Sequence, residues 1–287
     1  MKDSASDASL SATDVLTRFL RREVKAISYN EPLVHEGADP EGVHQLRVSA
    51  RRLRSELRAM RAVLPREPWR SLDEDLKWMG AVLGQRRDLD VLRDLFARHL
   101  TPGTLLHEEV TGALDRHSDA RQREVVAMFE SARYARIVRR LHRLSRDPRW
   151  GTRGRARAAE VFMPGLWDAS CEYLDAIGDP GARRSDDELH RVRIASKRCR
   201  YNFEIAALFL GPPARQVAKD LEAIQDVLGQ VHDRVVAISF LDTLGLDEEV
   251  DVEVRRALRA EISELRPQWV DPYVDARQRI LALFATH

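Results

Sequence analysis

The sequence is poor in the residues that would mark a disulfide-stabilised, fibrous or membrane-spanning protein. Only two of its 287 residues are cysteines, Cys171 and Cys199, which excludes a disulfide framework and a zinc finger and is typical of a reducing compartment. Glycine (14) and proline (12) are too few for a collagenous or low-complexity chain. The longest apolar runs, such as residues 205–210, span six residues, whereas a membrane helix needs about 20.

The N-terminus, MKDSASDASLSA, lacks the apolar core of a secretion signal. We therefore expect a disordered tail over residues 1–12 and a cytoplasmic protein without a membrane partner. Hydrophobic residues make up 44% of the chain, enough for a substantial core, and the length suggests about two domains.

Lysine is also scarce, because 42 of the 47 cationic residues are arginines. The formal net charge is only +1, but residues 1–150 carry 28 cationic and 23 acidic residues, and residues 151–287 carry 19 and 23. A GC-rich genome would explain the arginine excess. Phosphate binding would explain it too, since a guanidinium group binds phosphate through two parallel hydrogen bonds. The positions of the arginines must decide between these explanations.

Apolar residues recur at helical spacing along nearly the whole chain, and no stretch alternates with a period of two. This pattern predicts an all-α protein built as helical bundles. We expect helices over residues 13–35, 40–64, 67–84, 87–100, 105–145, 155–177, 186–210, 213–229, 232–244, 250–265 and 271–285. Breaks are expected at Gly37, Pro65, Gly84, Pro102, Pro148 to Gly154, Gly178 to Gly181, Gly211 to Pro213 and Gly245.

An internal repeat divides the chain. HQLRVSARRLR (44–54) aligns with HRVRIASKRCR (190–200), with the His and three Arg identical, and VLGQRRD (82–88) aligns with VLGQVHD (227–233). Each repeat follows a helix-start signal, Asp39 before Pro40 in one copy and Ser185 with Glu188 in the other. We infer an internal duplication that gives two pseudo-symmetric antiparallel helical bundles, over residues 13–148 and 155–287, with a junction near residues 145–157.

On a helical wheel, one arc of roughly 80° gathers the cations of each repeat, away from its apolar stripe. These basic ridges contain His44, Arg47, Arg51 and Arg54 in the first copy and His190, Arg193, Lys197 and Arg200 in the second. Arg52 and Arg198 flank the ridges, and Tyr201 lies next to His190.

Each ridge would repel itself, because residues 44–61 hold six arginines and one acid, and residues 190–201 hold five cations and no acid. An external anion would compensate this charge. The alternatives are a solvated face, or pairing with acids of neighbouring helices such as Asp88 and Asp233. Two ridges with the same phase favour anion binding. Each is about 15 Å long, which suits a linear polyanion better than a single phosphate.

Nucleic acid is the runner-up among linear polyanions, but it calls for stacking aromatics or base-reading side chains. The ridges offer only Tyr201 as an aromatic. A polymer of bare phosphates therefore fits the ridges better.

These residues resemble the CHAD domain family, named for a conserved-histidine α-helical domain. VHQLRVSARRLR (43–54) and LGQRRDLDVL (83–92) resemble its first half, and LHRVRIASKRCRY (189–201) and LEAIQDVLGQVHD (221–233) its second. The resemblance covers about residues 13–285. It implies two helical bundles with a basic cavity or groove between them, binding of inorganic polyphosphate, association with polyphosphate granules, and polyphosphate-metabolising enzymes as partners.

The resemblance also implies a set of polyphosphate-binding residues. They are His44, Arg47, Arg51, Arg52, Arg54, His190, Arg193, Lys197, Arg198, Arg200 and Tyr201, with Lys77 and Arg87 as second-ring cations. Glu204 and Glu222 occupy the positions that Arg58 and Lys77 have in the first copy. We therefore expect the two halves to contact the ligand unequally.

We expect a non-catalytic binder, scaffold or granule-targeting module rather than an enzyme. The chain has no P-loop, HExxH or GxSxG motif and no acidic cluster on its basic faces, which makes a metal-dependent phosphohydrolase the weaker alternative. Neither His44 nor His190 has an acid or second His at i+3 or i+4, so no metal or cofactor is expected. Asp88 and Asp233 are expected to orient Arg or His side chains.

Overall fold

The computed structural model describes residues 9–37, 39–59, 66–146, 152–181, 184–246 and 248–285, and these form helices and short connections without a strand. The predicted all-α class is confirmed. In chain order the helices are α1 (Ala12–Gly37), α2 (Pro40–Ala59), α3 (Arg66–Phe96), α4 (Leu105–Glu130), α5 (Ala132–Arg146), the 3₁₀ turn η1 (Thr152–Arg155), α6 (Ala158–Ile177), α7 (Asp186–Leu210), α8 (Pro212–Thr243), α9 (Glu248–Leu265), the 3₁₀ turn η2 (Arg266–Trp269) and α10 (Val270–Ala285).

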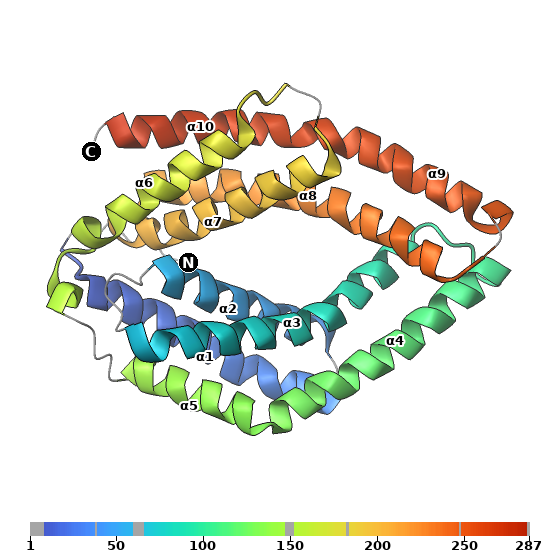
Figure 1. Cartoon of the computed structure of the whole chain (residues 1–287), viewed down its shortest axis with the longest axis horizontal. Coiled ribbons are helices and arrows are strands. Elements are labelled where there is room, and N and C mark those ends of the chain that lie inside the picture. Colours follow the sequence, from blue (N-terminus) through green and yellow to red (C-terminus); the bar gives the residue numbers. More distant parts are fainter. Residues whose placement is uncertain are drawn as a thin grey trace.

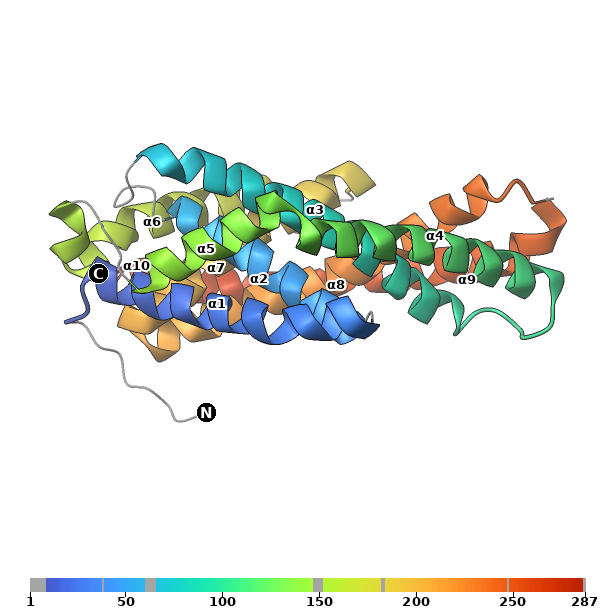
Figure 2. The same ribbon diagram turned by 90° about the horizontal axis from the view of Figure 1, so that it is seen from below.

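The two halves of the chain lie against each other. In Figure 1, α1–α5 occupy the lower part of the view and α6–α10 the upper part, and the halves meet where α2 contacts α7 and α3 contacts α8. Figure 2 shows that α4 and α9 reach the same end of the elongated molecule, away from the free end of α10. The helices repeat in the same order in each half, but a common origin of the halves stays a prediction.

Two apolar clusters hold the halves together. The main core draws on helices of both halves and includes the fully buried Leu46, Leu53 and Phe203. A second cluster joins the C-terminal parts of α3 and α8 to α4 and α9, around Phe96 and Leu258. No helix among the described residues is long and apolar enough to span a bilayer.

The predicted breaks at Gly84 and near residues 229–232 are wrong, because α3 and α8 continue through them. A glycine inside a helix costs only about 1 kcal/mol relative to alanine, which the packing of these long helices offsets. The predicted single helix over residues 105–145 is also wrong, since it is interrupted at Ser131. The Ser131 hydroxyl accepts from the Tyr134 amide at 3.1 Å and so begins α5.

Several predicted boundaries are confirmed. Gly211 has a φ of +74°, which ends α7, and Pro212 then begins α8 at a position where no amide donor is needed. Residues 9–12 of the predicted tail belong to the described fold, since the Ala158 amide donates to the Leu10 carbonyl at 2.8 Å and Leu10 is buried. Residues 1–8 of the predicted tail, Pro65, and residues 147–151 of the predicted junction lie outside the described residues.

Candidate functional site

The helices α2 and α7 begin at the capping signals expected from the sequence. The Asp39 carboxylate accepts from the Gly42 amide at 3.1 Å, and Ser185 with Glu188 forms a complete capping box. Leu53 and its counterpart Cys199 are fully buried, so the apolar stripes face the core. Their burial turns the basic ridges of α2 and α7 away from the core, toward the contact between the two halves.

A central cleft of about 900 Å³ lies between the ridges. Its walls come from α2 and α3 of one half and α7 and α8 of the other. The cleft brings together eight of the predicted binding residues, namely His44, Arg47, Arg51, Arg52, Arg87, Arg193, Lys197 and Arg200.

Three of these cations have no acidic partner. Among the described residues, no carboxylate comes within 4.0 Å of the charged groups of Arg51, Arg193 or Lys197, and the buried Nε atoms of Arg51 and Arg193 lack a hydrogen-bond partner. We call these three residues the unpaired trio. Burial, together with the charges of Arg193 and Arg51, lowers the pKa of Lys197 to about 7. Burial also lowers the pKa of both arginines in the trio.

The remaining arginines of the cleft are paired, some loosely. Arg47 lies 3.5 Å from Asp88, and Arg52 lies 3.5 Å from Glu204. Arg200 is held more firmly, by Glu222 at 2.7 Å and by Glu204 at 3.3 Å. The Asp88 contact agrees with the prediction that this acid orients an arginine.

Other predicted binding residues lie outside the cleft. Arg54, Arg198 and Tyr201 line a second space of about 1030 Å³, which we call the side cavity, and Arg51 and Lys197 line both spaces. Arg54 is bound by Asp73 at 3.0 Å, and Arg198 pairs with Glu172. For these two arginines the alternative of pairing with neighbouring acids holds.

The last two predicted residues are exposed. Lys77 on α3 lines neither space. His190 lies at the start of α7 with its ring centroid 5.8 Å from that of His232, which does line the cleft. The structure therefore places His190 beside the cleft and Lys77 away from it.

Tyr201 is 3% exposed and lies beneath the cations rather than in the cleft. The guanidinium carbons of Arg51 and Arg200 lie 5.9 and 5.1 Å from its ring centroid. Such contacts stabilise cations that are removed from water. Its position gives it a supporting role under the ridge instead of a stacking surface for bases.

A glycine of the repeated Leu-Gly-Gln segment accommodates one arginine. A Cβ atom built on Gly84 would lie 3.3 Å from Nε of Arg47, whereas one built on Gly229 would meet nothing within 4 Å. The absence of a side chain at Gly84 thus lets Arg47 lie close against α3. The same segment of α8 is open at the cleft wall.

The α8 wall contains residues that the predicted binding set omitted. They are Glu222, Gln225, Asp226, Gly229, Gln230, His232 and Asp233. Most follow one another at i+3 or i+4, so a helical wheel of α8 could have found them. Burial raises the pKa of Asp226 and Asp233 and lowers that of His232 and of His44 across the cleft. No set of three or more His, Cys, Asp or Glu within the described ranges is placed to hold a metal ion.

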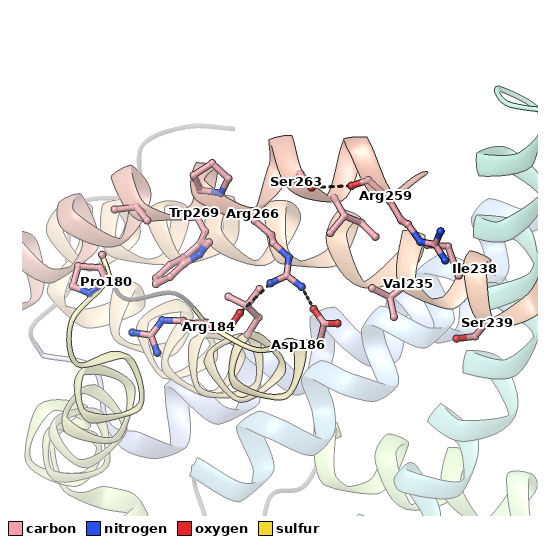
Figure 3. Close-up of a pocket in the computed structure, with 15 residues that line it drawn as sticks. Pro180, Arg184, Asp186, Val235, Ile238, Ser239, Arg259, Ser263, Arg266 and Trp269 are labelled. Atoms are coloured by element: carbon pink, nitrogen blue, oxygen red, sulfur yellow. Dashed lines mark hydrogen bonds and ion pairs between the residues drawn. The ribbon is translucent and has the colours of Figure 1, made fainter. Parts of the chain in front are cut away.

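A further pocket of about 790 Å³ lies between α7, α8 and η2 (Figure 3). Two of its three arginines, Arg184 and Arg266, connect neighbouring segments of the chain. Arg266 donates to the Arg184 carbonyl at 3.0 Å and pairs with Asp186, while Arg184 donates to the Asp179 carbonyl at 2.6 Å and lies over the ring of Trp269. Because these contacts fix the α6–α7 connection, this pocket is a weaker candidate for anion binding than the cleft.

Comparison with known proteins identifies relatives of the whole fold. The model of the CHAD domain family matches residues 18–242. The crystal structure of the CHAD domain from the plant Ricinus communis is similar with a TM-score of 0.71 at 29% sequence identity, covering 98% of this chain and 95% of that chain. A protein named PptA from Streptomyces chartreusis gives a TM-score of 0.67 at 19% identity, over 95% of this chain and 100% of that one, which shows a shared fold.

Two uncharacterized proteins of Mycobacterium tuberculosis, MT2285 and Rv2226, are each 28% identical to this chain over 212 residues. The match covers 69% of this chain but 39% of each relative. The match therefore spans less than half the length of these relatives.

Proposed function

The chain belongs to the CHAD domain family, and from that premise we propose that it binds inorganic polyphosphate in the central cleft without hydrolysing it. The unpaired trio carries the proposal. Arg51 from α2 and Arg193 and Lys197 from α7 converge on one space without an acid in ion-pair distance. Buried like charges are unfavourable, and a polyanion would relieve that cost.

The shape of the basic surface favours a polymer over a single phosphate. The cleft and the side cavity share Arg51 and Lys197, so a chain of phosphates could contact the cations of both. Orthophosphate would satisfy only part of this surface. We therefore expect long-chain polyphosphate to bind far more tightly than orthophosphate or ATP.

The lining of the cleft favours bare phosphates over nucleic acid. Its described residues include no Phe, Tyr or Trp, and Tyr201 is buried beneath the arginines. Single-stranded nucleic acid is usually held by stacking on exposed aromatic rings. A polymer without bases needs only the guanidinium and ammonium groups that are present.

The absence of catalysis is part of the proposal. Hydrolysis of phosphoanhydrides usually requires carboxylates that hold a divalent metal, or an activated nucleophile. Of the four carboxylates that line the cleft, Glu222 binds Arg200 and Asp88 lies near Arg47. Asp226 and Asp233 remain, and within the described ranges they belong to no group of three or more side chains placed to hold a metal ion. We further propose that the chain acts in the cytoplasm as a scaffold or targeting module at polyphosphate granules, beside polyphosphate-metabolising enzymes.

A titration of the chain with long-chain polyphosphate at two salt concentrations tests the proposal. We expect saturable binding that weakens steeply with salt, by analogy with counterion release from nucleic acid. Duplex and single-stranded DNA of matched charge serve as comparison ligands. Equal or tighter DNA binding, or no binding of polyphosphate, would contradict the proposal. Phosphate release on incubation with polyphosphate and Mg²⁺ or Mn²⁺ would contradict its non-catalytic part.

A further inference from the structure

Lys197 differs from the other lysines that the structure describes. Lys25, Lys77 and Lys219 are exposed, whereas Lys197 is partly buried and lines both the central cleft and the side cavity. Its side chain therefore borders two spaces, each large enough for a small molecule.

The surroundings of Lys197 favour its uncharged form. The charges that act on it most strongly are those of Arg193 and Arg200 on α7 and of Arg51 and Arg47 on α2. No carboxylate forms an ion pair with it among those that line the two spaces, which are Asp73, Glu74, Asp88, Asp168, Glu222, Asp226 and Asp233. A lysine that is desolvated next to other cations is a recognised type of nucleophile, since its nitrogen lone pair is free at neutral pH.

We propose that Lys197 is an acylation site whose donor is a small acyl phosphate. The guanidinium groups of Arg51 and Arg193 would hold the phosphoryl end of the donor and leave its carbonyl carbon beside the amine of Lys197. The same cleft serves the proposed function, but the inference does not require polyphosphate to be its ligand.

The reaction is a simple acyl transfer. The Lys197 nitrogen attacks the carbonyl carbon, a C–N bond forms, and the bond between that carbon and the phosphoryl oxygen breaks. Inorganic phosphate leaves with the bonding electron pair, and the nitrogen loses a proton to phosphate or solvent. The product is an uncharged amide, so acylation removes one member of the unpaired trio.

The expected rate advantage follows from two opposing effects. With a pKa of about 7, roughly three quarters of Lys197 is neutral at pH 7.5, against about one part in a thousand for an ordinary lysine. A less basic amine is also a weaker nucleophile, and a Brønsted coefficient like that of thiols, about 0.4–0.5, cancels part of the gain. A net advantage on the order of tenfold remains, before any gain from phosphate binding.

The test is incubation of the chain with acetyl phosphate at pH 7.5, followed by proteolysis and mass spectrometry at each lysine. The chain holds five lysines, so site occupancies are simple to compare. We expect Lys197 to be acetylated at least about ten times faster than Lys77 and Lys219. Equal or slower reaction at Lys197 would overturn the proposal.

A neutral acetyl ester, N-acetoxysuccinimide, separates amine reactivity from phosphate binding. Arg193→Gln should reduce the rate with acetyl phosphate relative to the neutral ester by at least about threefold, while Arg191→Gln, at an exposed position of the same helix, should not. An unchanged ratio in Arg193→Gln would refute acyl phosphate as the donor.

Addition of long-chain polyphosphate distinguishes this inference from the proposed function. Slower acetylation of Lys197, with no change at Lys77, supports both. Fast acetylation that depends on Arg193 but is unaffected by saturating polyphosphate would support the acylation site and contradict polyphosphate binding in the cleft.

Discussion

The two halves of the molecule use the same motif position in different ways. Arg54 in α2 and Arg200 in α7 occupy corresponding places, yet Arg54 lines the side cavity bound to Asp73, and Arg200 lines the cleft bound to Glu222. In the sequence repeat the counterpart of Asp73 is Ala218, and that of Glu222 is Lys77.

In each half, the arginine lines the same space as the acid of the neighbouring helix to which it is bound. The members of the unpaired trio, by contrast, lack such a partner in either half. The two copies of the repeat thus differ in the acids that lie next to their arginines. The consequence is a cleft that is basic along α2 and α7 and acidic along α8, where Glu222, Asp226 and Asp233 lie.

Reversing the charge of one member of the trio in each half should have the largest effect. We expect Arg51→Glu with Lys197→Glu to weaken polyphosphate binding at least about a hundredfold, because two charge-assisted contacts of about 1.5–3 kcal/mol each are lost. Fluorescence anisotropy with labelled polyphosphate measures the loss, and circular dichroism checks helicity. The control is Lys219→Glu with Arg256→Glu, two exposed positions outside the cleft. Unchanged affinity in a folded double variant would exclude Arg51 and Lys197 from the binding site.

The pH dependence should come mainly from the second half. Lys197 in the empty cleft has a pKa of about 7, and a bound polyanion favours its ammonium form, so binding takes up a proton above pH 7. Affinity should therefore fall as the pH rises from 7 to 9, by about tenfold. Titrations across this range measure the slope, with the lowered pKa of His44 and His232 acting in the same direction at lower pH.

The variant Lys197→Arg should flatten that slope, because arginine keeps its charge throughout the range. Asp226 and Asp233, whose pKa is raised, also favour tighter binding at lower pH, because their carboxyl groups lose negative charge as the pH falls. A slope that persists unchanged in Lys197→Arg would show that another group titrates.

Making the second half resemble the first should strengthen binding. Glu222→Lys introduces the residue found at the corresponding position, Lys77, and frees Arg200 from its 2.7 Å contact. We expect polyphosphate affinity to rise about three- to tenfold, a gain of roughly 1 kcal/mol. Glu253→Lys, at an exposed position on α9, makes the same change of charge outside the cleft and should have little effect at moderate salt. Weaker polyphosphate binding by the Glu222→Lys variant would mean that the Glu222 carboxylate assists binding.

The smallest expected difference in polyphosphate affinity is between alanine variants of Gly84 and Gly229, the corresponding glycines of the two copies. Gly84→Ala would place a Cβ 3.3 Å from Nε of Arg47 and move that arginine by a few tenths of an ångström, whereas Gly229→Ala has open space. Both should stabilise their helices by up to about 1 kcal/mol. Only Gly84→Ala should reduce polyphosphate affinity, by about twofold. Equal affinities would show that the fit of Arg47 against α3 does not matter for binding.

The periodicity of the sequence was sufficient to predict the helical class and the two ridges. Apolar residues such as Leu53 and Cys199 define the buried face of each ridge helix, and the opposite face then follows from helix geometry. The prediction that the ridges meet relied on the repeat and the family resemblance, and the cleft-lining positions of Arg51, Arg193 and Lys197 agree with it.

What the sequence missed depends on contacts between helices. A wheel of α2 alone places Arg54 with Arg51, but it contains no information on Asp73 of α3, which turns Arg54 away. The family resemblance implies Lys77 as a second-ring cation, but it gives no information on the exposure of this position of α3. The breaks predicted at Gly84 and near Gly229 are wrong for a related reason, because both glycines lie inside long helices. Gly84 makes room for Arg47 on the neighbouring helix, and Gly229 faces open space.

The two apolar clusters lie on either side of the cleft along α3 and α8, since Leu83 belongs to the main core, Arg87 to the cleft wall and Phe96 to the second cluster. Each cluster contains residues from both halves, so widening the cleft would require breaking one of them. The distance between the cleft walls is then set by the packing of leucine and phenylalanine side chains and not by the bound polyanion. A linear polyphosphate chain can adjust its torsion angles to a cleft of fixed width. We expect a bulky or branched polyanion of equal charge to be too wide to enter.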